Sequence, residues 1–179
     1  MNGHPGGIEH TRELLMLSGI LPGARIIDFG AGNGEAVRLM NSLGFNACGI
    51  DIAPRSGEVI RQDFLCTQYP GCSFDGVLSQ CSFYISGNIL KAVEEAHRIL
   101  KPGGILMLSD VWFKEPAEVL SGSFEILFQK DITAQWKEYY IDSIWRGDSL
   151  PCLFECKCRY FELICKKYKE VLLWTSSTE

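Results

Sequence analysis

A glycine-rich turn at residues 24–36, ARIIDFGAGNGEA, constrains the fold of this chain more than any other stretch. Apolar Ile26 and Ile27 lead into Asp28, three glycines then fall at alternate positions, and the residues that follow have helical periodicity. This order predicts a strand, a tight turn and a helix. Glycine is needed where a turn requires positive φ or where a ligand approaches the backbone, and a helix start presents unpaired N–H groups. The turn therefore predicts a ligand site at the end of the strand.

The spacing of the three glycines separates two classes of ligand. A dinucleotide site uses G-x-G-x-x-G, with a pyrophosphate on the helix N-terminus. Here the third glycine comes one residue early, and Glu35 stands where the dinucleotide pattern has glycine. The carboxylate of Asp28 suits a ligand with an ammonium group and repels a pyrophosphate. The spacing therefore disfavours a dinucleotide-dependent oxidoreductase.

Two stretches resemble the class I S-adenosylmethionine (SAM)-dependent methyltransferases. The motif DFGAGNG at 28–34 is similar to their first motif, D/E-x-G-x-G-x-G, and AHRILKPGGILMLSD at 96–110 is similar to the fifth-strand region of small-molecule members of the ubiquinone-biosynthesis-like group. The resemblance covers residues 24–112. It implies an α/β fold with a doubly wound, mostly parallel seven-stranded sheet in the order 3-2-1-4-5-7-6 and a helical insertion before the last strand.

The same resemblance implies a cofactor and an activity. SAM would be the methyl donor, S-adenosylhomocysteine the product and a small molecule the acceptor. A non-catalytic SAM-binding module or sensor would carry the same glycine turn and stays an alternative, and an arsenite-type metalloid methyltransferase is a lesser one. No residue declares itself as a general base, so the catalytic residues stay unknown at this point.

Cofactor contacts are expected at the turn and where the next strands end. Asp51 ends a strand expected over Phe45–Ile50, and an acid there accepts hydrogen bonds from the ribose hydroxyls. The resemblance assigns Asp63 and Phe64, after a strand expected over Val59–Gln62, to the adenine amino group and ring. The predicted cofactor-binding residues are Asp28, Gly30, Ala31, Gly32, Asn33, Gly34, Asp51, Ile52, Asp63, Phe64, Ser79, Gln80 and Cys81.

The exit of the fourth strand, expected over Phe74–Ser79, narrows the class of acceptor. The family's fourth motif lies at 79–84, and the Asn/Asp-Pro-Pro-aromatic form that marks many amino-group methyltransferases is absent there. Its absence lowers the expectation of DNA adenine, DNA cytosine or glutamine methylation. A net charge of −5 also argues against a broad nucleic-acid footprint. We therefore expect a small-molecule substrate and no nucleic-acid partner.

Substrate contacts are expected from segments on either side of the cofactor-binding core. The segment His4–Thr11 is predicted to fold over the site as a flap, with Gly6 and Gly7 as its hinge. Asp110 follows a fifth strand expected over Ile105–Ser109 and either contacts substrate or caps a turn. The predicted substrate-binding residues are His4, Thr11, Tyr84, Asp110, Trp136 and Tyr140.

Beyond residue 113 the sequence pattern is weaker. A sixth strand is expected over Phe124–Gln129 and a helix over Thr133–Arg146. Residues 152–168 then repeat a helical stripe, and the final strand is expected over Val171–Thr175, with Tyr160–Lys166 as the alternative. Two aromatic-rich helices would then lie before the last strand and cover the site.

The 179 residues are expected to form a single domain in three parts. These are an N-terminal helix and flap over 1–23, the cofactor-binding core over 24–112 and a substrate-side part over 113–179. No apolar run is long enough to span a membrane, and the first residues lack a basic-then-apolar signal pattern. We therefore expect a cytoplasmic protein, monomeric or homodimeric, with no membrane partner.

The chain contains eight cysteines, which a cytoplasmic location predicts to be reduced and mostly buried. Cys152, Cys156 and Cys158 form a C-x3-C-x-C pattern with no histidine nearby, and this is not a usual zinc spacing. We therefore expect no metal site.

Overall fold

The computed structural model describes residues 4–146 and 157–168. Seven strands lie in this part of the chain: β1 (Arg25–Phe29), β2 (Asn46–Asp51), β3 (Val59–Arg61), β4 (Phe74–Gln80), β5 (Leu100–Trp112), β6 (Phe124–Asp131) and β7 (Arg159–Lys167). The same part holds five helices: α1 (Gly7–Ser18), α2 (Glu35–Ser42), α3 (Ile89–Ile99), α4 (Pro116–Leu120) and α5 (Thr133–Trp145).

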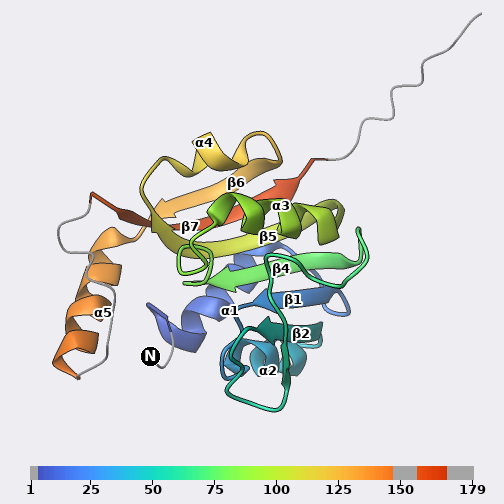
Figure 1. The fold of residues 1–179 in the computed structure, drawn as a ribbon, viewed down its shortest axis with the longest axis horizontal. Helices are drawn as coiled ribbons and strands as arrows, with labels where there is room; N and C mark the ends of the chain where they lie inside the picture. Colours follow the sequence, from blue (N-terminus) through green and yellow to red (C-terminus); the bar gives the residue numbers. More distant parts are fainter. Residues whose placement is uncertain (1–3, 147–156, 169–179) are drawn as a thin grey trace, which may run out of the picture.

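The seven strands form one sheet in the order β3-β2-β1-β4-β5-β7-β6 (Figure 1). Neighbouring strands are parallel except at β7, which is antiparallel to both β5 and β6. The predicted fold class and strand order are confirmed, and α5 is the helical insertion before the last strand.

The sheet separates two apolar layers because successive side chains of a strand point to opposite faces. Ile26 belongs to the layer that contains Leu14 of α1 and Met40 of α2. Its neighbour Ile27 belongs to the opposite layer, which contains Ala96 of α3. Both faces of the central strands are therefore covered, which explains why these strands are short, continuous apolar runs in the sequence.

The functional edge of the sheet is where β1, β2, β3 and β4 end. These strands are parallel, so the loops that follow them lie at the same edge. Figure 1 shows α5 and the N-terminal residues on this side of the sheet, at the left of the view. The segments expected to bind cofactor and the segments expected to bind substrate are thereby brought to one end of the molecule.

The last strand corrects the sequence prediction. β7 covers the alternative, Tyr160–Lys166, while the preferred segment Val171–Thr175 lies outside the described residues. The helical stripe predicted over 152–168 is wrong for the residues of β7, and 152–156 lie outside the described residues. β7 is an inner strand, so consecutive residues from Tyr160 to Cys165 are buried. A strand that is apolar on both faces also has apolar residues three and four positions apart, and this spacing resembles that of a helix.

The loop between β3 and β4 contains no helix and is fastened to α3 by charged side chains. Glu95 accepts hydrogen bonds from the backbone N–H of Thr67, at 2.9 Å, and from the Thr67 hydroxyl. Arg98 donates to Glu95 at 2.6 Å and to the Tyr69 carbonyl at 2.8 Å. This network fixes the course of the chain directly after Asp63, at the expected adenine side of the site.

Candidate functional site

The glycine turn has the backbone geometry that its sequence predicts. Gly30, Gly32 and Gly34 have φ values of 80°, 53° and 76°, in the left-handed region that favours glycine. The backbone N–H groups of Gly30 and Ala31 both donate to the carbonyl of Ile50, at 2.9 and 3.0 Å. The turn is therefore held against the end of β2 before α2 begins.

Two of the glycines also lie against side chains from other loops, and their positive φ disfavours any residue with a Cβ. A Cβ at Gly30 would collide with the hydroxyl of Ser82, and a Cβ at Gly32 would lie 2.8 Å from a guanidinium nitrogen of Arg55. The turn is thus enclosed by the exit of β4 on one side and by the 52–58 loop on the other. The backbone itself forms the floor of the site.

Asp51 joins this floor to the loop that follows β2. One carboxylate oxygen accepts from the backbone N–H of Gly32 at 2.9 Å, and the other accepts from the backbone N–H of Ala53 at 2.8 Å. A carboxylate has about four acceptor positions, so each oxygen can still accept a hydrogen bond from a ligand. The side chain is therefore oriented by the protein and open to two hydroxyl donors.

Asp28 is buried beneath the turn, with 5% of its surface exposed. Burial, together with the nearby charge of Asp51, raises the pKa of Asp28 from 3.8 to about 7. A positively charged ligand group would stabilise the ionised carboxylate and lower this pKa again. The electrostatics at the floor of the site therefore favour a cation.

The far end of the site is apolar. Phe64 stacks on Phe29 with ring centroids 5.4 Å apart, and on Phe83 with centroids 5.9 Å apart. It is 8% exposed, so most of its ring belongs to the core. Ile52 and Ile85 are 66% and 63% exposed and line the same cavity, so they offer a ligand more apolar surface than Phe64 does.

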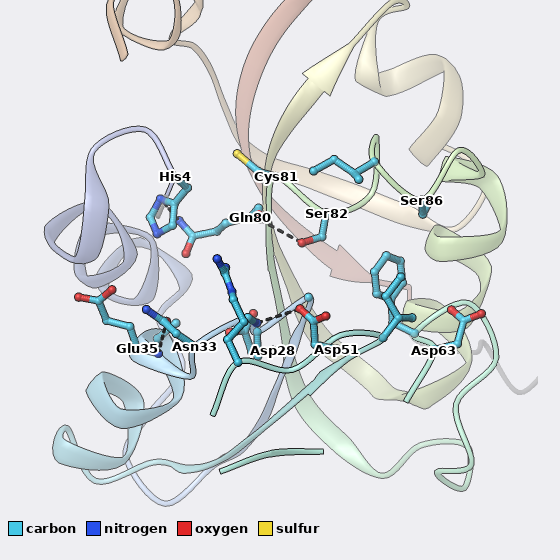
Figure 2. A pocket seen from close by; sticks show the side chains of 18 of the residues that line it. His4, Asp28, Asn33, Glu35, Asp51, Asp63, Gln80, Cys81, Ser82 and Ser86 are labelled. Carbon is cyan, nitrogen blue, oxygen red and sulfur yellow. Dashed lines mark hydrogen bonds between the residues drawn. The ribbon is translucent and has the colours of Figure 1, made fainter. Parts of the chain in front are cut away.

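A cavity of about 470 Å³ lies above the turn (Figure 2). In Figure 2 it extends from His4 and Glu35 at one end, past Asp28 and Asp51, to Asp63 and Ser86 at the other. The predicted site residues that line it are His4, Asp28, Gly30, Ala31, Gly32, Asn33, Asp51, Ile52, Asp63, Phe64, Gln80 and Cys81.

Several residues that line the cavity were not predicted from the sequence: Ile8, Glu35, Ala36, Arg55, Leu65, Ser82, Ile85 and Ser86. Glu35 and Ala36 directly follow the glycine motif in the first turn of α2, so their position in the chain could have indicated them. Arg55 lies in the short loop between β2 and β3. Ser82 lies in the exit of β4 at 79–84, which was expected to border the site, and Ile85 and Ser86 follow it in a stretch without a recognisable pattern.

Other predicted residues lie behind the cavity: Thr11, Gly34, Ser79, Tyr84, Asp110, Trp136 and Tyr140. Gly34 is the residue before α2, and Ser79 is fully buried with its hydroxyl 3.3 Å from the Phe29 carbonyl. These two residues support the floor of the cavity without lining it.

Asp110 has the turn-capping role rather than a place in the cavity. The strand β5 continues to Trp112, beyond the predicted end, so Asp110 lies inside a strand and is 1% exposed. One carboxylate oxygen accepts from the backbone N–H groups of Phe83 and Tyr84, at 2.7 and 3.2 Å. Burial raises the pKa of Asp110 to about 6, although these backbone hydrogen bonds act in the opposite direction. Asp110 therefore fixes the exit of β4.

The aromatic residues of α5 pack on β7 next to the cavity. Trp136 stacks on Tyr160 with ring centroids 5.9 Å apart and lies 5.4 Å from Tyr140. The Tyr160 hydroxyl is 2.9 Å from the sulfur of Cys81, which lines the cavity. Trp136 and Tyr140 are both 6% exposed, so they form a small core behind Cys81.

The N-terminal segment reaches the cavity through side-chain hydrogen bonds. α1 begins at Gly7, so only the first part of the predicted flap lies outside a helix. The His4 ring has Nε2 3.1 Å from the Thr11 hydroxyl and Nδ1 3.2 Å from the Gln80 amide nitrogen. The Thr11 hydroxyl donates to the Gln80 amide oxygen at 2.8 Å. Thr11 is fully buried, so it does not line the cavity itself but holds the side chains of His4 and Gln80, which do.

No group of three or more His, Cys, Asp or Glu side chains within residues 4–146 and 157–168 is arranged to hold a metal ion. Cys152 and Cys156 lie outside the described residues. Cys158 and Cys165 are buried, whereas Cys66 and Cys72 are exposed, so burial of the thiols is confirmed only for some of them. In the described part of the chain, no helix has both the length and the apolar character required to cross a membrane.

Comparison with known proteins identifies the family. A profile of the methyltransferase domain family matches residues 9–146, which include the turn, α3 and the whole of α5. The chain therefore belongs to this family of methyltransferase domains, and its sheet is the class I methyltransferase fold.

Individual relatives are more distant. The chain is 28% identical over 127 residues to a demethylmenaquinone methyltransferase of Tropheryma whipplei, covering 64% of this chain and 52% of that protein. It is 32% identical over 105 residues to a ubiquinone biosynthesis O-methyltransferase of Xanthomonas campestris, covering 50% and 44%. The chain thus spans about half the length of these curated relatives.

A solved structure has a similar fold. Phosphoethanolamine N-methyltransferase 2 of Haemonchus contortus, in complex with SAM, superposes with a TM-score of 0.73 at 16% identity, covering 93% of this chain and 54% of that one. At this identity the similarity concerns the fold alone.

Proposed function

We propose that this chain transfers a methyl group from SAM to a small-molecule acceptor. The observation that carries the proposal is the cavity itself, whose floor is a glycine turn with positive φ at Gly30 and Gly32. Membership of the methyltransferase domain family supports the same reaction.

The residues along the cavity fit the parts of SAM in order. Ile52 and Ile85 offer apolar surface for the adenine base, near Asp63. Asp51, already oriented by two backbone hydrogen bonds, has acceptor positions left for the two ribose hydroxyls. Asp28 supplies a buried carboxylate whose raised pKa favours a cationic ligand group. The methionine part of SAM would then lie toward His4 and Glu35, at the opposite end from Asp63 (Figure 2).

When bound, SAM supplies a methyl group on a positively charged sulfur. A nucleophile can attack the methyl carbon in line with the carbon–sulfur bond, and the sulfur is the leaving group. The work of the protein is to align the acceptor and to exclude water. His4, Gln80 and Cys81 line the end of the cavity where an acceptor would enter. The core of Trp136 and Tyr140 stabilises this end from behind.

The acceptor we propose is a small hydroxylated aromatic molecule. The relatives named above are a demethylmenaquinone methyltransferase and a ubiquinone biosynthesis O-methyltransferase, which supports a quinone-like acceptor. A cavity of about 470 Å³ must hold SAM and the reacting group together, which suits a small molecule.

The test is transfer of tritiated methyl groups from SAM to a panel of acceptors by the purified chain. The panel contains catechol, a short-chain hydroquinone and sarcosine, and the measured product is the methylated acceptor. We expect transfer to a hydroxylated aromatic acceptor. SAM binding without any methylated product would instead support a non-catalytic SAM-binding module.

A further inference from the structure

Three side chains from distant parts of the chain form a closed ring of hydrogen bonds at the cavity. His4 belongs to the N-terminal segment, Thr11 to α1 and Gln80 to the end of β4. The three distances are 3.1 Å from His4 Nε2 to Thr11 Oγ1, 2.8 Å from Thr11 Oγ1 to Gln80 Oε1 and 3.2 Å from Gln80 Nε2 to His4 Nδ1. His4 and Gln80 line the cavity and point toward each other in Figure 2.

With the Gln80 amide oriented as it is in the structure, the ring favours one tautomer of His4. The Gln80 carbonyl oxygen can only accept, so the single hydroxyl proton of Thr11 is donated to it. Toward His4, the Thr11 hydroxyl must then accept, which places a proton on Nε2. Nδ1 keeps its lone pair and accepts from the Gln80 amide. In this orientation of the amide, all three bonds are satisfied when His4 is neutral and protonated at Nε2. The Pro5 carbonyl, 3.1 Å from Nδ1, gains a donor only when Nδ1 also carries a proton.

We propose that His4 is the general base of methyl transfer and accepts the proton of a hydroxyl acceptor at Nδ1. This inference rests on the proposed function. In the structure the Gln80 amide N–H is the donor at Nδ1. In the proposed reaction the O–H of the acceptor takes its place as the donor. Thr11 is a positioning residue, because it holds the proton on Nε2 and so keeps the Nδ1 lone pair directed at the cavity.

The transfer step is balanced in charge and electrons. The proton leaves the acceptor hydroxyl for Nδ1, and an oxygen lone pair forms the bond to the methyl carbon. The electrons of the broken carbon–sulfur bond stay on sulfur, which becomes neutral, and the positive charge ends on His4. The imidazolium has a partner ready, since the Pro5 carbonyl lies 3.1 Å from Nδ1.

The surroundings of His4 keep it neutral before the reaction. The pKa of His4 is lower than its ordinary value of 6.5, chiefly because the side chain is buried. The nearby His10 also lowers this pKa, whereas the Pro5 carbonyl and Glu35 act in the opposite direction. His10 from α1 has its ring centroid 6.2 Å from that of His4, and Glu35 from α2 lines the same cavity. A neutral imidazole at pH 7 is the form that can accept a proton.

The first test requires no acceptor. The full chain contains three histidines, His4, His10 and His97, so their ring nitrogens can be resolved by long-range ¹H–¹⁵N spectra of the protein saturated with S-adenosylhomocysteine. His4→Asn and His97→Asn give the assignment. We expect His4 to be protonated at Nε2 only, with an apparent pKa below 6.5. A proton on Nδ1, or a pKa at or above 6.5, would overturn the proposal.

Variants of Thr11 separate a positioning role from a structural one. Thr11→Val keeps the shape but cannot accept from Nε2, so we expect His4 to populate the tautomer with its proton on Nδ1, bonded to the Pro5 carbonyl. Thr11→Ser should restore the Nε2–H tautomer. An unchanged His4 spectrum in Thr11→Val would show that the ring of hydrogen bonds does not set the tautomer.

The second test is kinetic and uses the catechol or hydroquinone of the acceptor panel. We expect His4→Asn to lower kcat by about 100-fold or more, the range of general base catalysis, and to abolish the loss of rate at low pH. The KM for SAM is measured in the same assay, so that the loss in kcat is separated from any loss of cofactor binding at this lining residue, and His97→Asn should behave as wild type. Wild-type turnover by His4→Asn would refute the role of His4, whereas failure of the unmodified chain to methylate any acceptor would refute the proposed function instead.

Discussion

The two ends of the cavity are built in different ways. The end at which we propose that adenosine binds comes from the loops after β1, β2, β3 and β4, and the Asp51 carboxylate there is fixed by the backbone N–H groups of Gly32 and Ala53. The acceptor end joins His4 and Thr11 to Gln80 through side chains alone. The first end depends on turns that allow few residue types, and the second on contacts between segments far apart in the chain.

This difference has a consequence for specificity. A single side-chain replacement at the acceptor end can change its shape while leaving β1, β2 and their turns intact. The same fold can therefore hold one cofactor and serve many acceptors, because function depends on the site rather than on the fold. The predictions below test this division, from the largest expected effect to the smallest.

The first prediction concerns a substitution in the glycine turn that should block cofactor binding. Gly32→Val places a branched side chain at φ 53°, against Arg55 and in the space above the turn. We expect S-adenosylhomocysteine affinity to fall by at least about 100-fold, or about 2.7 kcal/mol, in calorimetry. Gly57→Val is the matched control in the same loop region, because a Cβ there meets no atom within 4 Å. Equal affinities of the two variants would contradict the assigned role of the turn.

The second prediction concerns the buried charge beneath the turn. The folded-state pKa of Asp28 is about 7, above the value of 3.8 expected when unfolded. The folded chain therefore retains a proton that the unfolded chain has lost between about pH 4 and pH 7, so Asp28 makes stability fall as pH rises through this range. We expect Asp28→Asn to raise the free energy of unfolding at pH 8 by roughly 2–4 kcal/mol and to weaken SAM binding.

Denaturant unfolding at pH 5 and pH 8 measures this effect. At pH 5 the unfolded carboxyl is already ionised while the folded one is still protonated, so part of the loss of stability is present and the advantage of the variant should be clearly smaller than at pH 8. Asp75→Asn is the control, since Asp75 forms an exposed ion pair with Lys101 at 2.7 Å and its loss should not stabilise the chain. A variant that is less stable than wild type at pH 8 would show that Asp28 is not a destabilising charge.

The third prediction tests the ribose contact. Asp51→Ala removes a carboxylate that already accepts from two backbone N–H groups, so two ligand hydroxyls lose their acceptor. We expect cofactor binding to weaken by roughly 1–3 kcal/mol in calorimetry, and Asp51→Asn to weaken it less. Affinity within error of wild type for Asp51→Ala would mean that the residue only shapes the 52–58 loop.

The smallest effect is expected from the network behind the adenosine end. Thr67→Val removes one hydroxyl donor from Glu95 while the backbone N–H of Thr67 still donates. We expect the chain to lose about 1 kcal/mol of stability and less than threefold in cofactor affinity. A larger loss of affinity than of stability would show that the loop after Asp63 is coupled more tightly to the ligand than its hydrogen bonds indicate.

The glycine turn and Asp51 could be predicted from the sequence to meet at the end of the sheet, because each of these elements is local. The alternating glycines around Gly32 indicate a tight turn independently of the rest of the chain. Asp51 could be placed because it stands at the end of a short apolar strand. The strand order followed from the family resemblance that these residues carry, and it is confirmed.

The acceptor end could not be predicted in the same way. His4 and Thr11 were expected to contribute, but their ring with Gln80 depends on the docking of α1 against the sheet, which no local pattern encodes. Asp110 lies inside β5 because that strand is extended by pairing with β7, up to Trp112 opposite Arg159. The position of β7 was itself ambiguous, since a strand buried on both faces has no alternation of polar and apolar residues.

Calorimetric titration of the purified chain with S-adenosylhomocysteine, and separately with NADH, tests the central claim most directly. A cavity floored by the glycine turn, with Asp28 and Asp51 beside it, should bind one S-adenosylhomocysteine per chain and no NADH, because Asp28 lies beneath the turn and Glu35 replaces the third glycine of the dinucleotide pattern. Binding of NADH, or no binding of S-adenosylhomocysteine by folded protein, would contradict the account.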